Sequence, residues 1–210
     1  MSSTFWDARY ATDDYIFGTA PNRFLESQAA HIQPGMRALS IADGEGRNGV
    51  WLAAQGVDAV DVSPVALEKA RKLAAARGVT LDFELADVLD WTWPEAAYDL
   101  VVAIFIQFAP PPERDRITAG IRRTLKPGGV LILQGYTPKQ IEFATGGPPH
   151  AANMYTAALL RDWFGDWDIL HLAEHESVIR EGSHHSGLSA LIDLVARKPC
   201  ESPLVPDGRA

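Results

Sequence analysis

The sequence predicts an α/β fold in which a mainly parallel sheet is covered by helices on both faces. Between residues 36 and 137, apolar segments with strand-like patterns alternate with segments of helical spacing, and short connections separate them. A segment rich in glycine lies between the first apolar run and the helix that follows it. Strands that alternate with helices in this way are typical of a doubly wound parallel sheet.

The first strand and helix of this sheet lie on either side of the glycine-rich segment. Residues 36–42 are a short apolar run that suits a strand buried on both faces. Residues 46–56 have helical spacing, with a glycine at the end as a stop signal. A second strand is expected at residues 57–62, so the three segments form one βαβ unit.

The clearest helix follows the second strand. Ser63 is its expected N-cap, Pro64 suits its first turn, and Gly78 ends it. Three more strands are expected in the parallel part of the sheet, at residues 80–87, 98–106 and 130–137. An amphipathic helix is expected at 112–125, and Lys126-Pro127-Gly128-Gly129 ends it.

The last third of the chain no longer alternates strands with helices. Thr156 is the expected N-cap of a helix over 157–165, and two strand-like runs follow at 167–179 and 187–197. The residues between these runs, 180–186, are too few for a parallel crossover, so the runs should pair antiparallel. The tip of this hairpin should then face the same crevice as the glycine-rich segment.

Length and charge limit the classes of protein that fit. The chain has 210 residues, of which 47% are hydrophobic, and a net charge of −8. A single domain over 1–198, followed by a flexible tail at 199–210, fits this length. The acidic balance and the absence of a basic stripe argue against a nucleic acid as partner.

Cysteine usage and hydropathy indicate the compartment. The single cysteine, Cys200, is incompatible with a disulfide framework or a zinc site built on cysteines. The stretch "MSSTFWDARY" lacks the pattern of an export signal, and no apolar run approaches the length of a membrane span, about 18 residues. We therefore expect a cytoplasmic protein, monomeric or homodimeric, with no membrane partner.

The glycine-rich segment indicates a ligand that contains a nucleotide. Gly44, Gly46 and Gly49 have the G-x-G-x-x-G spacing, and Asp61 lies at the end of the next strand, 17 residues beyond Gly44. In this context the glycines allow a ligand to approach the backbone closely, and the carboxylate binds ribose hydroxyls. We expect Asp61 to have that role.

Charge at this segment selects between cofactors. Asp43 and Glu45 would lie beside the pyrophosphate of a dinucleotide, where like charges about 4 Å apart cost several kcal/mol. S-adenosylmethionine has no phosphate and carries a sulfonium and an ammonium group. The acidic residues therefore favour S-adenosylmethionine, with S-adenosylhomocysteine as its product. An NAD-linked oxidoreductase is the alternative that the glycine spacing alone supports.

Several further motifs agree with this interpretation, namely "ADGEGRNGVWLAAQG", "AVDVSPVALEKARKLA", "FELADVLDW", "YDLVVAIFIQF" and "LKPGGVLILQGYTPKQ". Together they resemble class I, Rossmann-like S-adenosylmethionine-dependent methyltransferases over nearly the whole chain. Within that group the chain is similar to small bacterial enzymes related to tellurite-resistance and thiopurine methyltransferases. The resemblance implies a seven-stranded sheet in the order 3-2-1-4-5-7-6 with the last strand antiparallel, and methyl transfer to a small-molecule acceptor.

The resemblance also implies which residues contact the cofactor. Asp61 would bind the ribose, Asp87 would lie near the adenine amino group, and Ile104-Phe105 would lie beneath the methionine portion. Residues 1–33 would cover the cofactor and include a helix from Asn22 to Ile32 behind the cover. The complete set of expected cofactor-binding residues is Trp6, Tyr10, Asp43, Gly44, Glu45, Gly46, Asp61, Val62, Ser63, Asp87, Val88, Ile104 and Phe105.

The glycine-rich segment departs from the family pattern at two positions. The family has an acidic residue where this chain has Ser40, and a glycine where it has Ala42. Ala42 should require a non-positive φ at that position, and Asp43 is the candidate to contact the cofactor ammonium instead. These differences bear on cofactor affinity, and they leave open a non-catalytic nucleotide-binding protein.

Aromatic residues are crowded near the N-terminus, at Trp6, Tyr10, Tyr15 and Phe17. They show no helical or strand regularity, so we expect an irregular flap that places ring faces near a sulfonium. The alternative is a flap that only anchors the N-terminus to the core. A second candidate boundary of the pocket is the Gly/Pro-rich segment 144–155.

Methyl transfer needs alignment and exclusion of water more than it needs a catalytic group. A thiolate or a selenium or tellurium oxyanion needs no strong base, whereas a hydroxyl or amine acceptor does. His185 at the hairpin tip is the expected base because imidazole titrates near neutral pH, and Tyr136 is the second catalytic candidate. Gln107 could only orient a substrate. His184 and His185 point to opposite faces of an extended segment, so no metal site is expected.

Overall fold

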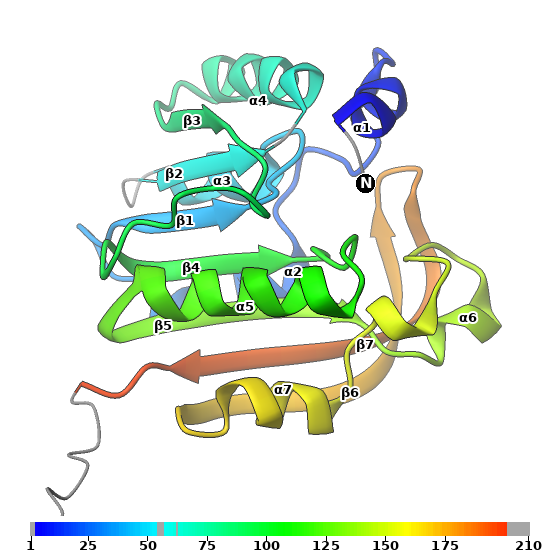
Figure 1. Ribbon diagram of the computed structural model, residues 1–210. Helices are drawn as coiled ribbons and strands as arrows, with labels where there is room; N and C mark the ends of the chain where they lie inside the picture. Colours follow the sequence, from blue (N-terminus) through cyan, green and yellow to red (C-terminus); the bar gives the residue numbers. More distant parts are fainter. Residues whose placement is uncertain (1–2, 54–56, 62, 201–210) are drawn as a thin grey trace, which may run out of the picture.

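The computed structural model describes residues 3–53, 57–61 and 63–200, and Figure 1 shows their arrangement. Val62, an expected cofactor contact, and residues 201–210 of the expected tail lie outside the described residues.

The described residues form one seven-stranded sheet in the order β3-β2-β1-β4-β5-β7-β6. Strands β1 to β5 pair in parallel, whereas β7 is antiparallel to both of its neighbours, β5 and β6. The strands are β1 Ala38–Ile41, β2 Val57–Asp61, β3 Asp82–Leu85, β4 Tyr98–Ile104, β5 Leu125–Tyr136, β6 Asp168–Glu181 and β7 His185–Arg197. The predicted α/β class with a mixed sheet is confirmed.

Helices cover both faces of this sheet (Figure 1). The α-helices are α1 Ser3–Tyr10, α2 Arg23–Ser27, α3 Arg47–Leu52, α4 Pro64–Arg77, α5 Pro111–Thr124, α6 Gln140–Phe143 and α7 Ala157–Phe164, with single 3₁₀ turns at η1 Ala29–His31 and η3 Ala151–Asn153. Alternate residues of β4 belong to two separate cores. Val101 and Ala103 pack with α5 and α7, whereas Leu100 and Val102 pack with α2, α3 and α4. This alternation is the period of two that a strand imposes.

Local capping signals in the sequence correspond to helix ends in the structure. The Ser63 side chain accepts a hydrogen bond from the amide of Ala66 at the start of α4, and Gly78 ends the helix with a φ of +65°. Thr156 caps α7 in the same way through the amide of Leu159. These three cap predictions are confirmed. Each cap depends only on residues within about one helical turn, so the local sequence is enough to predict it.

Other boundaries differ from the prediction. Residues 3–10 form helix α1 where an irregular flap was expected, because Trp6 and Tyr10 are one helical turn apart and stack at 5.8 Å between ring centroids. The helix expected over 22–32 is divided into α2 and η1. Residues 126–129, expected as a break, lie inside β5, where they interrupt the regular register with β4.

The β6–β7 hairpin bends toward the N-terminal segment, and Figure 1 shows its tip close to α1. The His184 amide donates a hydrogen bond of 3.1 Å to the carbonyl of Ile16. A Cβ atom at Gly182 would lie 2.3 Å from the same carbonyl oxygen. The hairpin tip and the covering segment are therefore packed backbone against backbone.

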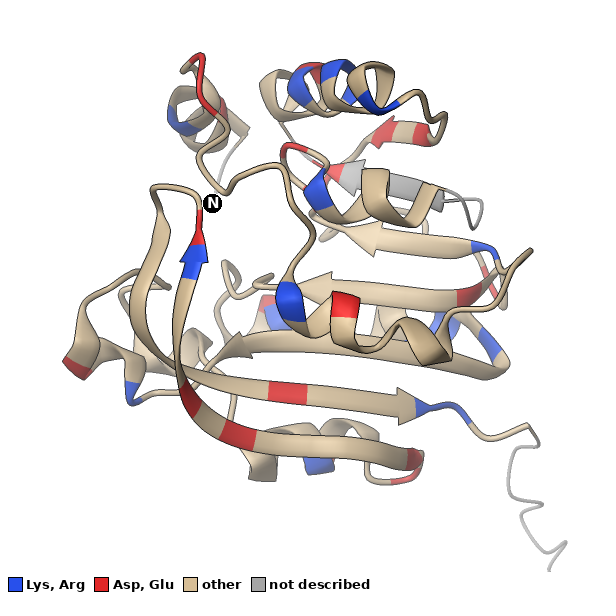
Figure 2. Ribbon diagram, turned by 180° about the vertical axis from the view of Figure 1, so that it is seen from behind, with Lys and Arg blue, Asp and Glu red and all other residues tan. Residues whose placement is uncertain are grey.

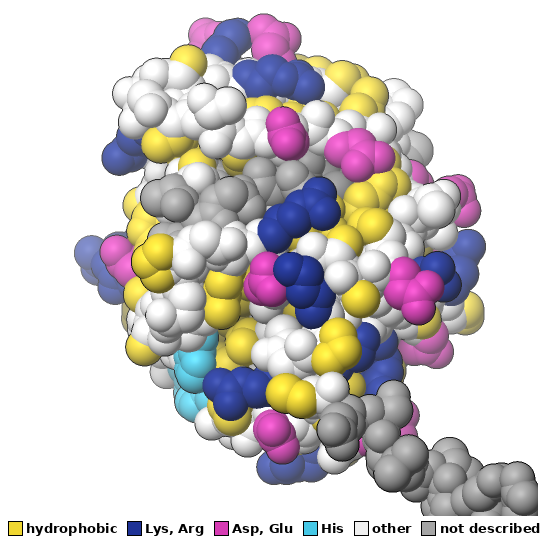
Figure 3. Space-filling view, turned by 90° about the vertical axis from the view of Figure 1, so that its left-hand side faces the viewer, with side chains coloured by type: hydrophobic (Ala, Val, Ile, Leu, Met, Phe, Trp, Pro, Cys, Tyr) yellow, Lys and Arg dark blue, Asp and Glu magenta, His cyan; other side chains and the backbone are white. Residues whose placement is uncertain are grey.

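Charged residues are dispersed over the surface. Figure 2 shows Lys and Arg scattered along the ribbon and not gathered in a stripe. Figure 3 shows the edge formed by the N-terminal ends of the parallel strands, where basic and acidic side chains are neighbours. The pair Lys126–Asp99, at 2.8 Å, belongs to this edge. Across the described ranges, no helix combines the length and the apolar character that crossing a bilayer requires.

We predict that Gly182→Ala loosens the contact between the hairpin and the covering segment. The residue has a φ of +72°, and the added methyl group would collide with Ile16. The free energy of unfolding should fall by about 1–3 kcal/mol, and amide hydrogen exchange should accelerate in residues 14–18. Ser183→Ala, at the exposed neighbouring position, is the control. Unchanged exchange in residues 14–18 would contradict this account of the packing.

Candidate functional site

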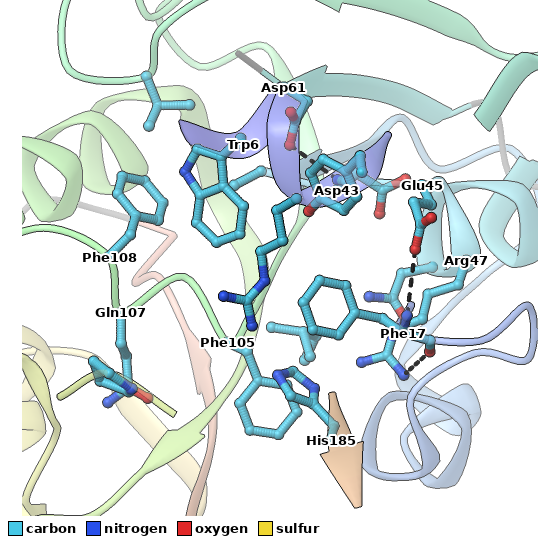
Figure 4. A pocket seen from close by; sticks show the side chains of 18 of the residues that line it. Trp6, Phe17, Asp43, Glu45, Arg47, Asp61, Phe105, Gln107, Phe108 and His185 are labelled. Carbon is cyan, nitrogen blue, oxygen red and sulfur yellow. Dashed lines mark hydrogen bonds between the residues drawn. The ribbon is translucent and has the colours of Figure 1, made fainter. Parts of the chain in front are cut away.

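A cavity of about 440 Å³ lies at the C-terminal ends of the parallel strands, under α1 and the hairpin tip (Figure 4). This volume is within the range of about 300–1,000 Å³ that small-molecule sites occupy. Of the residues expected from the sequence, those that line it are Trp6, Tyr10, Asp43, Gly44, Glu45, Asp61, Asp87, Val88, Ile104, Phe105, Tyr136 and His185.

Two expected cofactor contacts do not line the cavity. Gly46 packs against α4, where a Cβ atom would lie 2.6 Å from that of Ala70, so this glycine permits helix packing. Ser63 is fully buried, caps α4, and donates a hydrogen bond of 2.6 Å to Asp7 of α1. Both residues support the site from outside the cavity.

Asp61 ties the glycine-rich loop to the end of β2. Its carboxylate accepts hydrogen bonds from the backbone amides of Gly44, at 3.0 Å, and Ser63, at 2.8 Å. Gly44 has a φ of +59°, and a Cβ atom there would lie 2.8 Å from the Tyr10 hydroxyl. The loop therefore needs a glycine at this position, and the structure places the Asp61 carboxylate at the cavity edge.

Ala42 has a φ of +47°, so the expectation of a non-positive φ was wrong. The backbone keeps the left-handed conformation at the position where the family has glycine, although alanine adopts it only at a cost of about 1–2 kcal/mol. The hydrogen bonds of the neighbouring Asp43 hold the loop in this shape. Alanine at this position should therefore lower the stability of the loop.

Asp43 points toward the start of α3. Its carboxyl group accepts a hydrogen bond of 2.5 Å from the Ser40 hydroxyl and one of 3.1 Å from the Gly49 amide. Burial raises the pKa of Asp43 to about 7, against the effect of these hydrogen bonds, which lower it. Ser40, which stands at the position where the family has an acidic residue, thus serves as a hydrogen-bond donor to Asp43.

Glu45 is neutralised by a buried lysine. The Lys69 amine lies 2.5 Å from one carboxylate oxygen of Glu45, and the other oxygen accepts a hydrogen bond from the amide of Phe17. With Glu45 paired and the pKa of Asp43 near 7, these two residues repel a pyrophosphate less than their sequence positions alone suggest. The carboxyl groups of Asp61 and Asp87 also line the cavity.

Lys69 was not identified from the sequence. Its amine also donates hydrogen bonds to the carbonyls of Tyr10, Thr12 and Asp14, at 3.4, 3.1 and 2.6 Å. The available signal was its position on the buried stripe of α4, which otherwise consists of Ala66, Leu67, Ala70, Leu73 and Ala74. A lysine on an apolar helix face must find buried partners, but the sequence does not show which ones.

Aromatic rings form the wall of the cavity at the hairpin end. His185 lies 4.5 Å from Phe17 and 4.6 Å from Phe105 between ring centroids, and Phe105 stacks on Tyr136 at 4.7 Å. Phe105 has a φ of +55°, a conformation that a bulky residue adopts only where its surroundings impose it. Figure 4 shows Phe105, Phe17 and His185 grouped on one side, with Asp61 on the other.

The two catalytic candidates are buried and are weak proton acceptors at neutral pH. Burial, together with the positive charges of Arg47 and Arg9, lowers the pKa of His185 to about 3, so the expectation that it titrates near neutrality was wrong. Burial raises the pKa of the Tyr136 hydroxyl above its usual range, which keeps it protonated. His185 is therefore a neutral imidazole, and its role as a base stays a prediction.

Gln107 does not have a free amide for a substrate. Its Nε2 donates to the carbonyl of Tyr136 at 2.9 Å, and its Oε1 accepts from the Tyr136 amide at 2.6 Å. These bonds connect the end of β4 to the end of β5. Within the described residues, His, Cys, Asp and Glu side chains form no group of three that could hold a metal ion.

A buried polar network supports the hairpin end of the cavity and was also missed from the sequence. Arg47 on α3 forms an ion pair of 2.8 Å with Glu181 at the end of β6. Asn22 donates to the other oxygen of Glu181 and to Gln134 of β5, at 3.0 and 2.7 Å. The partners are far apart in sequence, so only the topology brings them together. The Gly147-Pro148-Pro149 segment, part of the predicted pocket boundary at 144–155, does line the cavity.

Comparison with known sequences finds a family match over part of the chain. Residues 38–129 match a family described as a methyltransferase domain. An uncharacterized protein of Mycobacterium tuberculosis is 30% identical over 137 residues, which are 62% of this chain and 49% of that protein. The chain thus spans about half the length of the curated relatives it matches first.

Comparison with solved structures shows the fold. A protein studied for the conversion of a disulfide bond into a thioacetal group during echinomycin biosynthesis superposes with a TM-score of 0.76 at 23% identity, covering 97% of this chain and 95% of that one. TehB from Haemophilus influenzae has a TM-score of 0.69 at 16% identity, covering 93% and 66%. The N-methyltransferase NodS of Bradyrhizobium japonicum, solved with S-adenosylhomocysteine, has a TM-score of 0.70 at 15% identity, covering 94% and 98%. The chain therefore has the fold of S-adenosylmethionine-dependent methyltransferases, and S-adenosylmethionine is the cofactor consistent with it.

We predict that Ala42→Gly stabilises the protein. Glycine adopts a φ of +47° without the steric cost that alanine has, so the free energy of unfolding should rise by up to about 1 kcal/mol in denaturant titration. Ala75→Gly, at an exposed position in the last turn of α4, is the matched control and should lower it by up to about 1 kcal/mol. Equal losses in both variants would show that the loop conformation does not strain Ala42.

We predict that His185 makes the protein less stable as the pH falls below 6.5. The unfolded chain binds a proton near pH 6.5, whereas the folded imidazole excludes it until about pH 3, so acid favours unfolding in this window. Between pH 6.5 and 4, the wild type should lose up to about 1.4 kcal/mol per pH unit relative to His185→Gln. A difference between the two proteins that does not vary with pH would indicate an ordinary pKa for His185.

Proposed function

We propose that this protein is a methyltransferase that uses S-adenosylmethionine to methylate a small-molecule acceptor. The observation that carries the proposal is one cavity with two different ends. The glycine-rich loop and the Asp61 carboxyl group form one end, and the aromatic rings around His185 form the other. Such a cavity can hold a nucleoside and a reacting partner side by side.

The residues at the first end fit the cofactor. Asp61 would bind the ribose hydroxyls, Asp87 and Val88 would flank the adenine, and Ile104 would lie under the methionine portion. When bound, S-adenosylmethionine supplies a methyl group on a positively charged sulfur atom that leaves as a neutral sulfide. Trp6 and Tyr10 on α1 close the cavity above this end and exclude water from it.

The state of the buried side chains favours an acceptor that needs no base. His185 is too weakly basic at neutral pH, and the Tyr136 hydroxyl stays protonated. A nucleophile that reaches the cavity already deprotonated, such as a thiolate or a selenium or tellurium oxyanion, avoids this difficulty. The similarity to a protein studied for the conversion of a disulfide bond into a thioacetal group agrees with a sulfur acceptor. We therefore propose this acceptor class and the related tellurite-resistance and thiopurine group.

The volume of the cavity supports a small acceptor. About 440 Å³ must accommodate the cofactor as well as the acceptor, and α1 and the hairpin tip cover the opening. A peptide or a nucleic acid strand would have to displace both elements.

A titration with three ligands tests the cofactor. S-adenosylmethionine and S-adenosylhomocysteine should bind in calorimetry, and NADH should not. Binding of NADH alone would favour the oxidoreductase, which the similarity to known proteins does not favour. If the first two ligands bind and methyl transfer to thiols, selenite and tellurite is undetectable, the non-catalytic nucleotide-binding protein becomes the better account.

We predict that Asp61→Asn weakens the binding of S-adenosylhomocysteine. The amide cannot accept hydrogen bonds at both of its ends, so it loses either the Gly44 or the Ser63 contact as well as the charge that binds the ribose. A loss of about 1.5–3 kcal/mol corresponds to an affinity about 10–100-fold lower.

Asp82→Asn is the control for this prediction. It makes the same change in charge at an exposed position at the start of β3. This position is at the N-terminal ends of the parallel strands, whereas the cavity is at their C-terminal ends. Calorimetric titration of both variants checks the prediction, and equal affinities would remove Asp61 from the site.

A further inference from the structure

The cavity has an arginine whose charge is not neutralised by an ion pair. Arg9, in the last turn of α1, lines the cavity. Its guanidinium carbon lies 5.8 Å from the centroid of Trp6 and 5.9 Å from that of Phe17. Its Nε is buried without a hydrogen-bond partner, and in the described part of the chain no carboxylate forms an ion pair with it.

Arg47 provides the contrast. It lines the same cavity, but it forms an ion pair with Glu181 and donates a hydrogen bond to the carbonyl of Phe17. Arg47 is buried, and a deeply buried cation normally has such partners, whereas the Arg9 side chain as a whole is half-buried with only its Nε fully covered. Arg9 is therefore a cavity cation that still has donors to offer, and these donors are charged.

Two buried polar atoms near the aromatic wall also have unsatisfied hydrogen bonding. Tyr136 is 1% exposed and His185 is 9% exposed. Neither the Tyr136 hydroxyl nor His185 Nδ1 has a hydrogen-bond partner among the described residues. The Glu181 carboxylate is 4.0 Å from that Nδ1 atom, which is beyond hydrogen-bond distance. Buried groups of this kind are normally paired, so both are positioned for polar atoms of a ligand.

The remaining surface at this end is flat and aromatic. The rings that meet there are those of Phe17, Phe105, Tyr136 and His185. Aromatic rings pack best against other planar π-systems, in offset-stacked or edge-to-face arrangements. The Gly147-Pro148-Pro149 segment completes the wall. A planar organic molecule fits this surface better than a compact inorganic ion does.

We propose that the methyl acceptor is a planar aromatic acid whose anionic group pairs with Arg9. A separate group on the same ring that arrives deprotonated, such as a thiolate, forms the new bond to the methyl carbon while the bond from that carbon to the cofactor sulfur breaks, and S-adenosylhomocysteine leaves. This inference rests on the proposed function and narrows its acceptor class. The ring of the acid lies among Phe17 and Phe105, and its other polar atoms meet Tyr136 and His185. The Asp61 and Asp87 carboxyl groups and the unpaired Arg9 line the same cavity, so it offers both a negative and a positive group, which matches a cationic cofactor beside an anionic acceptor.

The anion that Arg9 binds could instead be the carboxylate of the cofactor. Arg9 lies between the two ends. Its guanidinium carbon is 5.8 Å from the centroid of Trp6, which covers the cofactor end, and 5.9 Å from that of Phe17, which contacts His185. The charge of Arg9 contributes to the low pKa of His185, so it acts on the aromatic end, and we assign its anionic partner to the acceptor on that ground together with the geometry.

Calorimetry on the protein saturated with S-adenosylhomocysteine tests the proposal without turnover. The probes are pairs that share one skeleton and differ only in the acid, namely benzoate and benzamide, 4-hydroxybenzoate and 4-hydroxybenzamide, and 4-mercaptobenzoate and 4-mercaptobenzamide. The unaltered protein should bind the acids at least about tenfold more tightly than the amides, as a charge-assisted hydrogen bond provides.

Three variants of the protein complete the experiment. In Arg9→Gln the preference for the acids should be lost, and Arg9→Lys should retain part of it. Arg23→Gln makes the same change in charge at an exposed position of α2, so it should keep the full preference. The affinity of Arg9→Gln for S-adenosylhomocysteine should stay within about threefold of the unaltered protein, which also shows that the variant is folded.

The outcomes separate the two proposals. If S-adenosylhomocysteine binds and the acids show no preference over the amides, only the acceptor class is wrong. If Arg9→Gln weakens S-adenosylhomocysteine by tenfold or more, Arg9 binds the cofactor carboxylate and the inference fails. If the unaltered protein does not bind S-adenosylhomocysteine, the proposed function fails, and the inference that rests on it fails too.

Discussion

The buried amine of Lys69 is the interaction on which the closed site depends. It joins three parts of the chain, because it belongs to α4, pairs with Glu45 in the glycine-rich loop, and donates hydrogen bonds to the carbonyls of residues 10, 12 and 14. A lysine can be buried only where all its donors are satisfied. The covering segment therefore supplies carbonyls to a charge that also holds the loop. Without that segment, the Lys69 amine would lose three carbonyl acceptors, and Glu45 would lose the hydrogen bond from the Phe17 amide.

This arrangement changes the electrostatics of cofactor selection. The sequence alone predicts that Asp43 and Glu45 are two negatively charged residues next to the ligand. In the structure, Glu45 is paired with Lys69, and Asp43 is buried against Ser40 and Gly49 with a pKa near 7. Both acids hold the loop in shape. The repulsion of a pyrophosphate by this loop is therefore weaker than the sequence suggests. A carboxylate at the ribose, the position expected for Asp61, is common to both cofactor classes and does not discriminate between them.

The sequence predicts the parts of the fold that depend on neighbouring residues. Strand patterns, the Ser63 and Thr156 caps and the glycine spacing are local, and they define the position of the cavity. The sequence could not show that Ala42 adopts a positive φ, because the hydrogen bonds of Asp43 impose it. It could not show that Arg47 meets Glu181, since those residues are distant along the chain. Helix α1 was missed for a related reason, as its stability depends on packing within the covering segment.

Burial has opposite consequences for a base and for a charged acceptor at this site. It lowers the pKa of His185, which leaves the imidazole neutral and only weakly basic at neutral pH. It also deprives an anionic nucleophile of its water shell, which makes the nucleophile more reactive but costs free energy when it enters. A cation inside the cavity offsets that cost, and Arg9 is in a position to do so. A dry aromatic cavity with an unpaired arginine thus suits an acceptor that arrives as an anion, and the weak basicity of the site then follows from the same desolvation.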